Sequence, residues 1–419
     1  MHPIRQHARV LTASLVGTAV EFFDFYIFGT AAALVFGPLF FPSESTAAQQ
    51  LAAFMSFGLA FFARPLGAVA FGHFGDRVGR KATLVASLLL MGGSTVLIGV
   101  LPGYAAIGTL APLLLCLLRF GQGFGLGGEW GGAALLAVEN APPGWEARFG
   151  AAPQMGAPLG FLFSNGLFLL LGIGLSEADF VAWGWRIPFL ASAVLVAVGL
   201  WIRLRISETS AFARAQAPAE AVPIAAVIRR HPLLLLAASA GAASCFAVFY
   251  LSTAFALSYA TSTLGIDRQT FLALQLGANL FFALGIVGAA MAADRFGAGR
   301  IMVLGAVLTI ATGLVFGPVL ASASLPAIFV LLSFSLMVMG LSYGPLSVWL
   351  SQLFPVRVRY TAISLAFTLG GIVGGALTPI AAQQLASSGQ IVAAGWLLAA
   401  VALLTLAGLS LARPHYSEE

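Results

Sequence analysis

The segment GDRVGRK, residues 75–81, returns in altered form as ADRFGAGR at residues 293–300. Each copy follows a long apolar run and contains an Asp-Arg pair, and the two pairs lie 218 residues apart. One Asp-Arg dipeptide carries little information, but two copies at equivalent places indicate an internal repeat. The repeat predicts a chain built from two similar halves.

A second echo supports the repeat. ENAP at residues 139–142 corresponds to QLFP at residues 352–355, and an arginine follows each segment, Arg148 and Arg359. Both segments come after a later apolar run of their own half. The two echoes together are more specific than either alone.

The composition places the chain in a membrane. Of its 419 residues, 60% are hydrophobic and 8% are charged, with a mean hydropathy of +0.97. Soluble domains carry about 25% charged residues. Apolar runs of about 20 residues, each long enough to span a bilayer as a helix, recur along the whole chain. This predicts an all-α integral membrane protein, and the net charge of +5 indicates topology rather than nucleic-acid binding.

Twelve transmembrane helices are predicted. Their spans are 11–39, 49–73, 82–101, 105–137, 148–175, 185–206, 232–261, 268–292, 300–321, 326–352, 360–386 and 390–411. The longest polar stretch, 207–231, divides them into an N-terminal six-helix bundle (1–206) and a C-terminal one (232–419). Six-helix repeats on either side of a cytoplasmic linker are one way in which secondary transporters are built.

Basic residues predict the orientation of the helices. With a cytoplasmic N-terminus, sixteen arginines and lysines fall on the cytoplasmic side and only Arg186 and Arg268 fall on the other. Short cytoplasmic loops carry such an excess. Both termini are therefore expected in the cytoplasm. Arginine outnumbers lysine 19 to 1, which indicates a bacterial protein, and the inner membrane is its expected location.

Ionisable side chains lie inside the predicted spans, all of them in the N-terminal half. They are Glu21, Asp24, Arg64, Arg119 and Glu129. A charge at such depth is costly and usually faces a partner or a pathway. At a rise of about 1.5 Å per residue, Asp24 and Arg119 both lie roughly 20 Å into the membrane, and Glu21 lies level with Arg64.

These depths predict two ion pairs between helices, Asp24 with Arg119 and Glu21 with Arg64. The plain alternative is that both pairs are static and only hold helices together. A buried ion pair stabilises a fold poorly, because desolvation offsets its attraction. It works better as a switch: when Arg119 moves away, Asp24 is expected to bind a proton.

Several segments resemble the major facilitator superfamily. GHFGDRVGRK (72–81) resembles its loop motif between helices 2 and 3, and RFGQG (119–123) resembles its helix-4 motif, whose arginine is implicated in proton coupling. Five segments together resemble the metabolite:proton symporter branch, whose members carry shikimate, citrate, 2-oxoglutarate, other dicarboxylates, proline or betaine. They are VEFFDFYIFGTAAALVF, ARPLGAVAFGHFGDRVGRK, GGEWGGA, WGWRIPFL and FPVRVRYT.

The resemblance implies a cytoplasmic gate of charged residues. Its members are Asp76, Arg77, Arg80 and Lys81, with Glu139 and Arg148 nearby, and Asp294, Arg295 and Arg359 in the second half. The alternative is a solvated loop that only sets topology. Gln352 stands where the family commonly has glutamate, which puts a symmetric latch in doubt. Glu129 could join the gate or line the cavity below it.

The substrate cavity is expected between the halves. Its candidate residues are Tyr26, Gln122, Gln154, Asn165, Tyr250, Gln275, Asn279, Tyr343 and Trp349, although each is also a plausible packing residue. An anionic substrate needs a cation, and Arg119 or Arg64 is available. Betaine would instead need an aromatic box.

The expected function is proton-coupled symport of a small organic acid, shikimate-like or a di- or tricarboxylate, by alternating access. Alternatives are a proton/osmolyte symporter for betaine or proline, and an exporter or uniporter. The five histidines lie in loops or tails without metal-ligand spacing, so no enzyme activity, metal site or cofactor is expected, only the proton as coupling ion. The lipid bilayer is the expected partner, nucleic acid is not, and the chain is expected to be a monomer.

Overall fold

The structure is a computed structural model that describes residues 7–78, 80–127, 129–205, 223–356 and 358–412. Within these ranges the side chains of 9–10, 72–78, 80–84, 202–205, 223 and 226 are not described. The described chain is helical throughout and contains no strand. The predicted all-α class is confirmed.

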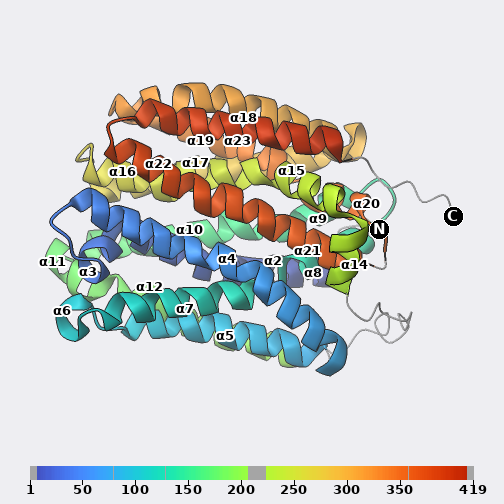
Figure 1. The fold of residues 1–419 in the computed structure, drawn as a ribbon, viewed down its shortest axis with the longest axis horizontal. Coiled ribbons are helices and arrows are strands. Elements are labelled where there is room, and N and C mark those ends of the chain that lie inside the picture. The colour runs from blue at the N-terminus through green and yellow to red at the C-terminus, as the bar shows by residue number, and fades with distance from the viewer. Residues whose placement is uncertain (1–6, 79, 128, 206–222, 357, 413–419) are drawn as a thin grey trace.

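The helices of the N-terminal half run along the long axis of the molecule (Figure 1). They are α2 (Ala8–Ala31), η1 (Ala32–Phe36), α3 (Gly37–Phe40), α4 (Thr46–Val78), α5 (Arg80–Val100), α6 (Tyr104–Ile107), α7 (Leu110–Leu126), α8 (Glu129–Glu139), α9 (Glu146–Gln154), α10 (Gly156–Gly174), α11 (Glu177–Asp179), η2 (Phe180–Gly184) and α12 (Arg186–Arg205).

The helices of the C-terminal half, yellow to red, lie mostly above them in the same view (Figure 1). They are α14 (Pro223–Arg230), α15 (Pro232–Tyr250), η3 (Leu251–Phe255), α16 (Ala256–Ser262), α17 (Arg268–Phe296), α18 (Ala298–Ala321), α19 (Leu325–Tyr343), α20 (Leu346–Leu353), α21 (Arg359–Gly371), η4 (Ile372–Leu377), α22 (Thr378–Ser387) and α23 (Ile391–Leu411).

Each of the twelve predicted helices corresponds to a helical segment. In the described part of the chain, ten segments are long and apolar enough to cross a membrane, and an eleventh forms if Glu177–Gly184 and Arg186–Trp201, bent by 43°, are one span. The remaining predicted helix corresponds to α5, whose apolar part is Val85–Val100. The fifth helix is interrupted by a turn at Met155, between α9 and α10.

Helix packing is most extensive within each half, with α2 against α10 and α4 against α7 in the first and α18 against α23 in the second. Small residues permit these close approaches. A Cβ atom on Gly160 of α10 would lie 2.7 Å from Phe22 Cβ and 2.8 Å from Phe23 N of α2. The GAPLG segment at 156–160 therefore packs α10 closely on α2, because small residues let two helix backbones approach.

Two π-helical turns, η1 and η3, interrupt the first helix of each half at positions 219 residues apart. Such turns widen a helix and free carbonyl groups, and they are frequent at functional sites. In η3 the freed carbonyls of Ser252 and Thr253 each accept a hydrogen bond from Gln275 Nε2 at 2.9 Å. The repeat seen in the sequence thus extends to the irregular turns.

The division at 207–231 stays a prediction, because residues 206–222 lie outside the described ranges. The last part of this stretch forms α14, a helix that the sequence analysis did not predict. We call the end of the bundle where α2 begins and α23 ends the terminal end, since both chain ends are marked there (Figure 1).

Candidate functional site: buried charges beside a closed central cavity

Asp24 lies in α2 and Arg119 in α7, and both side chains are 0% exposed. The Asp24 carboxylate accepts a hydrogen bond from Ser192 Oγ of α12 at 2.6 Å, and Thr95 Oγ1 of α5 lies 3.5 Å from its other oxygen. Among the described residues, no cation lies within ion-pair distance of Asp24. The predicted direct pair of Asp24 with Arg119 is therefore wrong for this conformation.

Gln122 occupies the place of that pair. Its Oε1 accepts a hydrogen bond from Arg119 Nη1 at 2.6 Å, and its Nε2 donates to the Asp24 carbonyl at 3.0 Å and to Thr95 Oγ1 at 2.8 Å. Gln122 lies one helical turn beyond Arg119, so both side chains leave the same face of α7. The neutral amide thus joins the cation to the surroundings of the carboxylate.

Aromatic rings hold the Arg119 guanidinium. Its Cζ lies 4.2 Å from the ring centroid of Phe25, 4.1 Å from that of Phe28 and 4.9 Å from that of Phe57. Ring faces attract cations, and the effect is largest where water is absent. Arg119 Nε also donates to the Phe57 carbonyl at 3.3 Å, whereas Nη2 has no hydrogen-bond partner among the residues that the structure describes.

The predicted pair of Glu21 with Arg64 is confirmed. Arg64 Nη2 lies 3.4 Å from Glu21 Oε1, and both side chains are 4% exposed. Arg64 also faces the C-terminal half, because its Cζ lies 5.7 Å from the ring centroid of Phe367 in α21. This second cation is therefore at the boundary between the halves, whereas Arg119 lies inside the N-terminal half.

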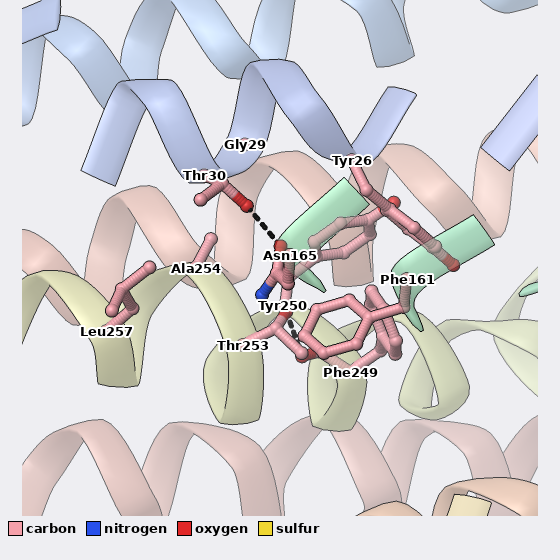
Figure 2. A pocket seen from close by; sticks show the side chains of 10 residues that line it. All are labelled: Tyr26, Gly29, Thr30, Phe161, Asn165, Phe249, Tyr250, Thr253, Ala254 and Leu257. Atoms are coloured by element: carbon pink, nitrogen blue, oxygen red, sulfur yellow. Dashed lines mark hydrogen bonds between the residues drawn. The ribbon is translucent and has the colours of Figure 1, made fainter. Parts of the chain in front are cut away.

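A small cavity lies at the same boundary (Figure 2). Its walls come from α2, α10 and the α15–η3–α16 helix, and Tyr26, Asn165 and Tyr250 are among the predicted residues that line it. Thr30 Oγ1 donates to Asn165 Oδ1 at 2.6 Å across it. The cavity volume is about 10 Å³, roughly what one water molecule requires, so a metabolite does not fit without movement of the walls.

A second cavity of about 10 Å³ shares Tyr26, Phe249 and Tyr250 with the first. Tyr343 and Phe367 also line it. The predicted placement of four candidates, Tyr26, Asn165, Tyr250 and Tyr343, at a cavity between the halves thus agrees with the geometry. We refer to the two hollows together as the central cavity.

Four other cavity candidates lie elsewhere. Gln122 is inside the N-terminal half, and Gln275 supports η3 from behind the cavity wall. Gln154 donates to the Tyr343 carbonyl at 2.7 Å, and Asn279 donates to the Pro158 carbonyl at 2.9 Å, so both join the halves. The ninth candidate, Trp349, packs against α15 at Gly241. Sequence spacing does not distinguish such contacts from a cavity lining.

Asp294 joins the two halves at the terminal end. Its carboxylate accepts the backbone N–H of Ala147 at 2.7 Å and of Arg148 at 3.3 Å, and Arg148 Nε lies 3.2 Å from Asp294 Oδ2. The carboxylate of α17 thus lies at the N-terminus of α9, where the helix dipole favours a negative charge. One side chain of the C-terminal half binds a helix end and a side chain of the N-terminal half.

Glu139 and Arg359 form a second contact at this end, 3.7 Å apart. By the repeat, its counterpart would join residue 352 to Arg148, but Gln352 is uncharged. The two halves therefore do not form equivalent ion pairs at this end, as the presence of Gln352 led us to expect. Arg295 instead lies over the Phe296 ring, 5.2 Å from its centroid.

Four predicted gate residues, Asp76, Arg77, Arg80 and Lys81, lie outside the described side chains. Glu129 accepts a hydrogen bond from Ser87 at 2.5 Å, which leaves both of its predicted roles open.

Contacts at the opposite end were missed by the sequence analysis. Arg268 of α17 makes two contacts with Glu177 of α11, at 3.1 and 3.0 Å, and its Cζ lies 3.6 Å from the Phe180 ring centroid. Gln383 of α22 donates to Gln50 of α4 at 2.9 Å. The sequence held one signal for these contacts: arginine is rare in the predicted loops at this end, and Arg268 is one of the few. With contacts at both ends, the central cavity is enclosed.

Long apolar helices in two packed groups, buried charges in the interior and polar contacts at both ends of the boundary are features of a multi-pass membrane transporter. The profile of the Major Facilitator Superfamily matches residues 14–374. The chain belongs to the major facilitator superfamily and is a transporter, not an enzyme.

Relatives agree with this assignment. The chain is 46% identical to the inner membrane metabolite transport protein YhjE of Escherichia coli, covering 98% of this chain and 94% of that protein. It is 39% identical to the E. coli shikimate transporter, covering 90% and 87%. A proline/betaine transporter of Salmonella typhimurium is 29% identical, with 95% and 82% covered.

The fold is also that of a solved structure. The proton:xylose symporter XylE superposes with a TM-score of 0.75 at 16% identity, over 95% of this chain and 94% of that chain. At this identity the similarity concerns the fold alone.

Proposed function

We propose that the chain is a proton-coupled symporter that carries a small organic acid across the bacterial inner membrane by alternating access. The observation that carries the proposal is Asp24, a fully buried carboxylate with hydroxyl donors and with no cation of the described residues in ion-pair contact. Burying an unpaired charge is costly, and binding a proton removes that cost. Asp24 therefore holds a proton in this enclosed conformation.

Arg119 supplies the second state of the switch. Its charge is permanent, and Gln122 now separates it from Asp24. When Gln122 turns away, Arg119 pairs with Asp24 and the proton leaves. The coupling ion is thus the proton and no other cofactor takes part. The membrane potential adds about 2.3 kcal/mol per net charge per 100 mV to the driving force.

The terminal end faces the cytoplasm in this proposal, as the excess of arginine indicates. Asp294 with Arg148, and Glu139 with Arg359, then close the cytoplasmic side, and Arg268 with Glu177 closes the other side. Alternating access requires that each set open while the other holds. The 39% identity to a shikimate transporter supports an organic acid as the cargo.

The test uses the purified protein in vesicles that contain a pH-sensitive dye. Shikimate, 2-oxoglutarate, citrate, benzoate, proline and betaine are added one at a time. Internal acidification driven by one organic acid supports the proposal. Radiolabelled uptake without acidification for every member of the panel overturns the coupling.

A proton/osmolyte symporter is the second candidate function. The aromatic lining of the central cavity favours it, because ring faces bind quaternary ammonium groups. Acidification by betaine or proline alone would select this candidate.

A further inference from the structure

The central cavity is walled by aromatic rings from both halves. Tyr26 of α2 stacks on Phe249 of α15, with centroids 4.8 Å apart and planes at 29°. Phe161 and Tyr250 lie against the same pair, at 5.8 Å and 6.5 Å from Tyr26. Among the described residues that line it, none is acidic or basic. A wall of this kind binds a flat apolar body and disfavours several charges.

Polar groups at the wall are few and have spare bonding capacity. The Tyr343 hydroxyl is buried, with the residue 2% exposed, and no described residue lies within ordinary hydrogen-bond geometry of it; the Trp130 side chain is the nearby polar group. Asn165 uses its oxygen for Thr30, and its amide nitrogen points away from Thr30 (Figure 2). Buried polar groups are normally satisfied. Asn165 lines the first hollow and Tyr343 the second, so a ligand hydroxyl group placed in the second hollow can bond Tyr343.

One cation lies next to this wall. Arg64 faces Phe367, which lines the cavity, and its Nε is buried without a hydrogen-bond partner in the described part of the chain. Its contact with Glu21 is long, at 3.4 Å, compared with about 2.7–2.9 Å for a strong charge-assisted hydrogen bond. Arg64 is itself buried, with its side chain 4% exposed, so a carboxylate reaches it only when the wall at Phe367 moves. One cation at this place suits a single carboxylate. A second carboxylate of the same ligand would face phenyl rings.

We propose that the substrate is a monocarboxylate on a flat unsaturated ring, of the hydroxybenzoate class. Its ring enters between Tyr26 and Phe249, its carboxylate replaces Glu21 on Arg64, and its ring hydroxyl bonds Tyr343. The inference rests on the proposed function and narrows its substrate. Because Tyr26 and Phe249 belong to different halves, admitting a ring between them requires the halves to move apart.

The test measures binding by calorimetry on the full chain in detergent, without any gradient. The ligands are 4-hydroxybenzoate, benzoate, shikimate, 2-oxoglutarate, citrate and betaine. We expect 4-hydroxybenzoate to bind about tenfold more tightly than shikimate, because aromatic contacts on both ring faces contribute on this order. Tighter binding of shikimate, a di- or tricarboxylate, or betaine overturns the proposal.

Two variants test the named contacts. Tyr343→Phe should weaken 4-hydroxybenzoate about five- to tenfold, the effect of one buried hydrogen bond, and leave benzoate unchanged. Tyr104→Phe, in α6 at the opposite end, is the control. An equal loss for both ligands, or no loss, contradicts the role of Tyr343.

Glu21→Gln should bind 4-hydroxybenzoate several-fold more tightly, because a neutral amide competes less well for Arg64. A gain in affinity is not explained by misfolding. Weaker or unchanged binding, with Glu44→Gln in an exposed loop as control, contradicts the competition.

The binding and vesicle experiments distinguish failure of the substrate inference from failure of proton coupling. If a hydroxybenzoate binds but drives no acidification of vesicles, the inference stands and symport fails. If citrate drives acidification and hydroxybenzoate does not bind, symport stands and the inference fails.

Discussion

Arg119 keeps its charge among three phenyl rings, one carbonyl and one amide. This arrangement stabilises a buried guanidinium without fixing it to a carboxylate. Its polar side-chain partner is Gln122, whose amide accepts from Arg119 and donates to the Asp24 carbonyl at once. A neutral bridge is easier to break than an ion pair in a water-poor site. In the proposed switch, Gln122 keeps Arg119 and Asp24 apart until the proton leaves.

Gln122→Glu tests this account. The new carboxylate would lie where Oε1 now accepts from Arg119 at 2.6 Å, and it would hold the guanidinium in a fixed ion pair. We expect a folded protein whose uptake rate falls by at least about tenfold, a loss equivalent to roughly 1.4 kcal/mol of barrier. Initial rates in vesicles give the measurement, with exposed Gln384→Glu in α22 as control. Unchanged uptake would mean that Arg119 need not leave Gln122.

The sequence predicted part of this site. Depth along each helix placed Glu21 level with Arg64, and that pair is present. The same reasoning placed Asp24 level with Arg119 but did not show which neighbour fills the space between them. A pair at equal depth meets only if both helices are rotated toward each other, and helix rotation depends on packing that one sequence does not specify.

At the scale of elements, Asp294 links the second half to α9 through two backbone N–H groups and Arg148. A helix N-terminus is a good anion site, so the contact stays favourable without any other partner. The motif ADRFGAGR led us to predict Asp294 as a gate residue. It did not show that the partner is a helix end, because the start of α9 at Glu146 is set by the preceding turn.

Asp294→Asn tests the contact between these elements. The amide can still accept an N–H, but its charge, and with it the attraction to the helix dipole and Arg148, is lost. We expect the terminal-end contact to weaken by about 0.5–2 kcal/mol. Cysteines placed along the terminal side of the cavity should then react faster with a thiol reagent. Asp267→Asn, which changes the exposed N-cap of the same helix, serves as control, and equal reactivity of the two variants would contradict the latch.

Helix breaks show the same limit of prediction. Hydrophobic length predicted twelve helices and each is present, yet the π-helical turns η1 and η3 were not predicted. These irregularities depend on side chains from other helices, such as Gln275 on the carbonyls of η3. Local sequence does not contain that information.

At the scale of the whole molecule, polar contacts close the boundary between the halves at both ends. Arg268 and Glu177 act at one end, and Asp294 and Arg148 act at the other. A transporter with both ends closed lies between its two open states, and the relative strength of the two sets biases it toward one side. The internal repeat predicted the two halves. Arg268 and Glu177, however, lie outside every motif quoted from the sequence.

Glu177→Gln should shift the molecule in the direction opposite to Asp294→Asn. Loss of the Arg268 partner favours opening at the end that carries α11. Because the sites lie far apart, the double variant should return close to the balance of the wild type. Cysteine accessibility on the two sides of the cavity reports the balance. If both single variants open the same end, the two contacts are not opposing latches.

Asp24→Asn tests the central claim, that Asp24 carries the coupled proton. The matched control is Asp267→Asn, and both variants are compared with the wild type in vesicles under an imposed pH gradient. The account predicts that Asp24→Asn still exchanges labelled for unlabelled substrate, because the neutral amide mimics the protonated carboxyl, but no longer concentrates substrate above the external level. Accumulation at the wild-type level by this variant would contradict the account.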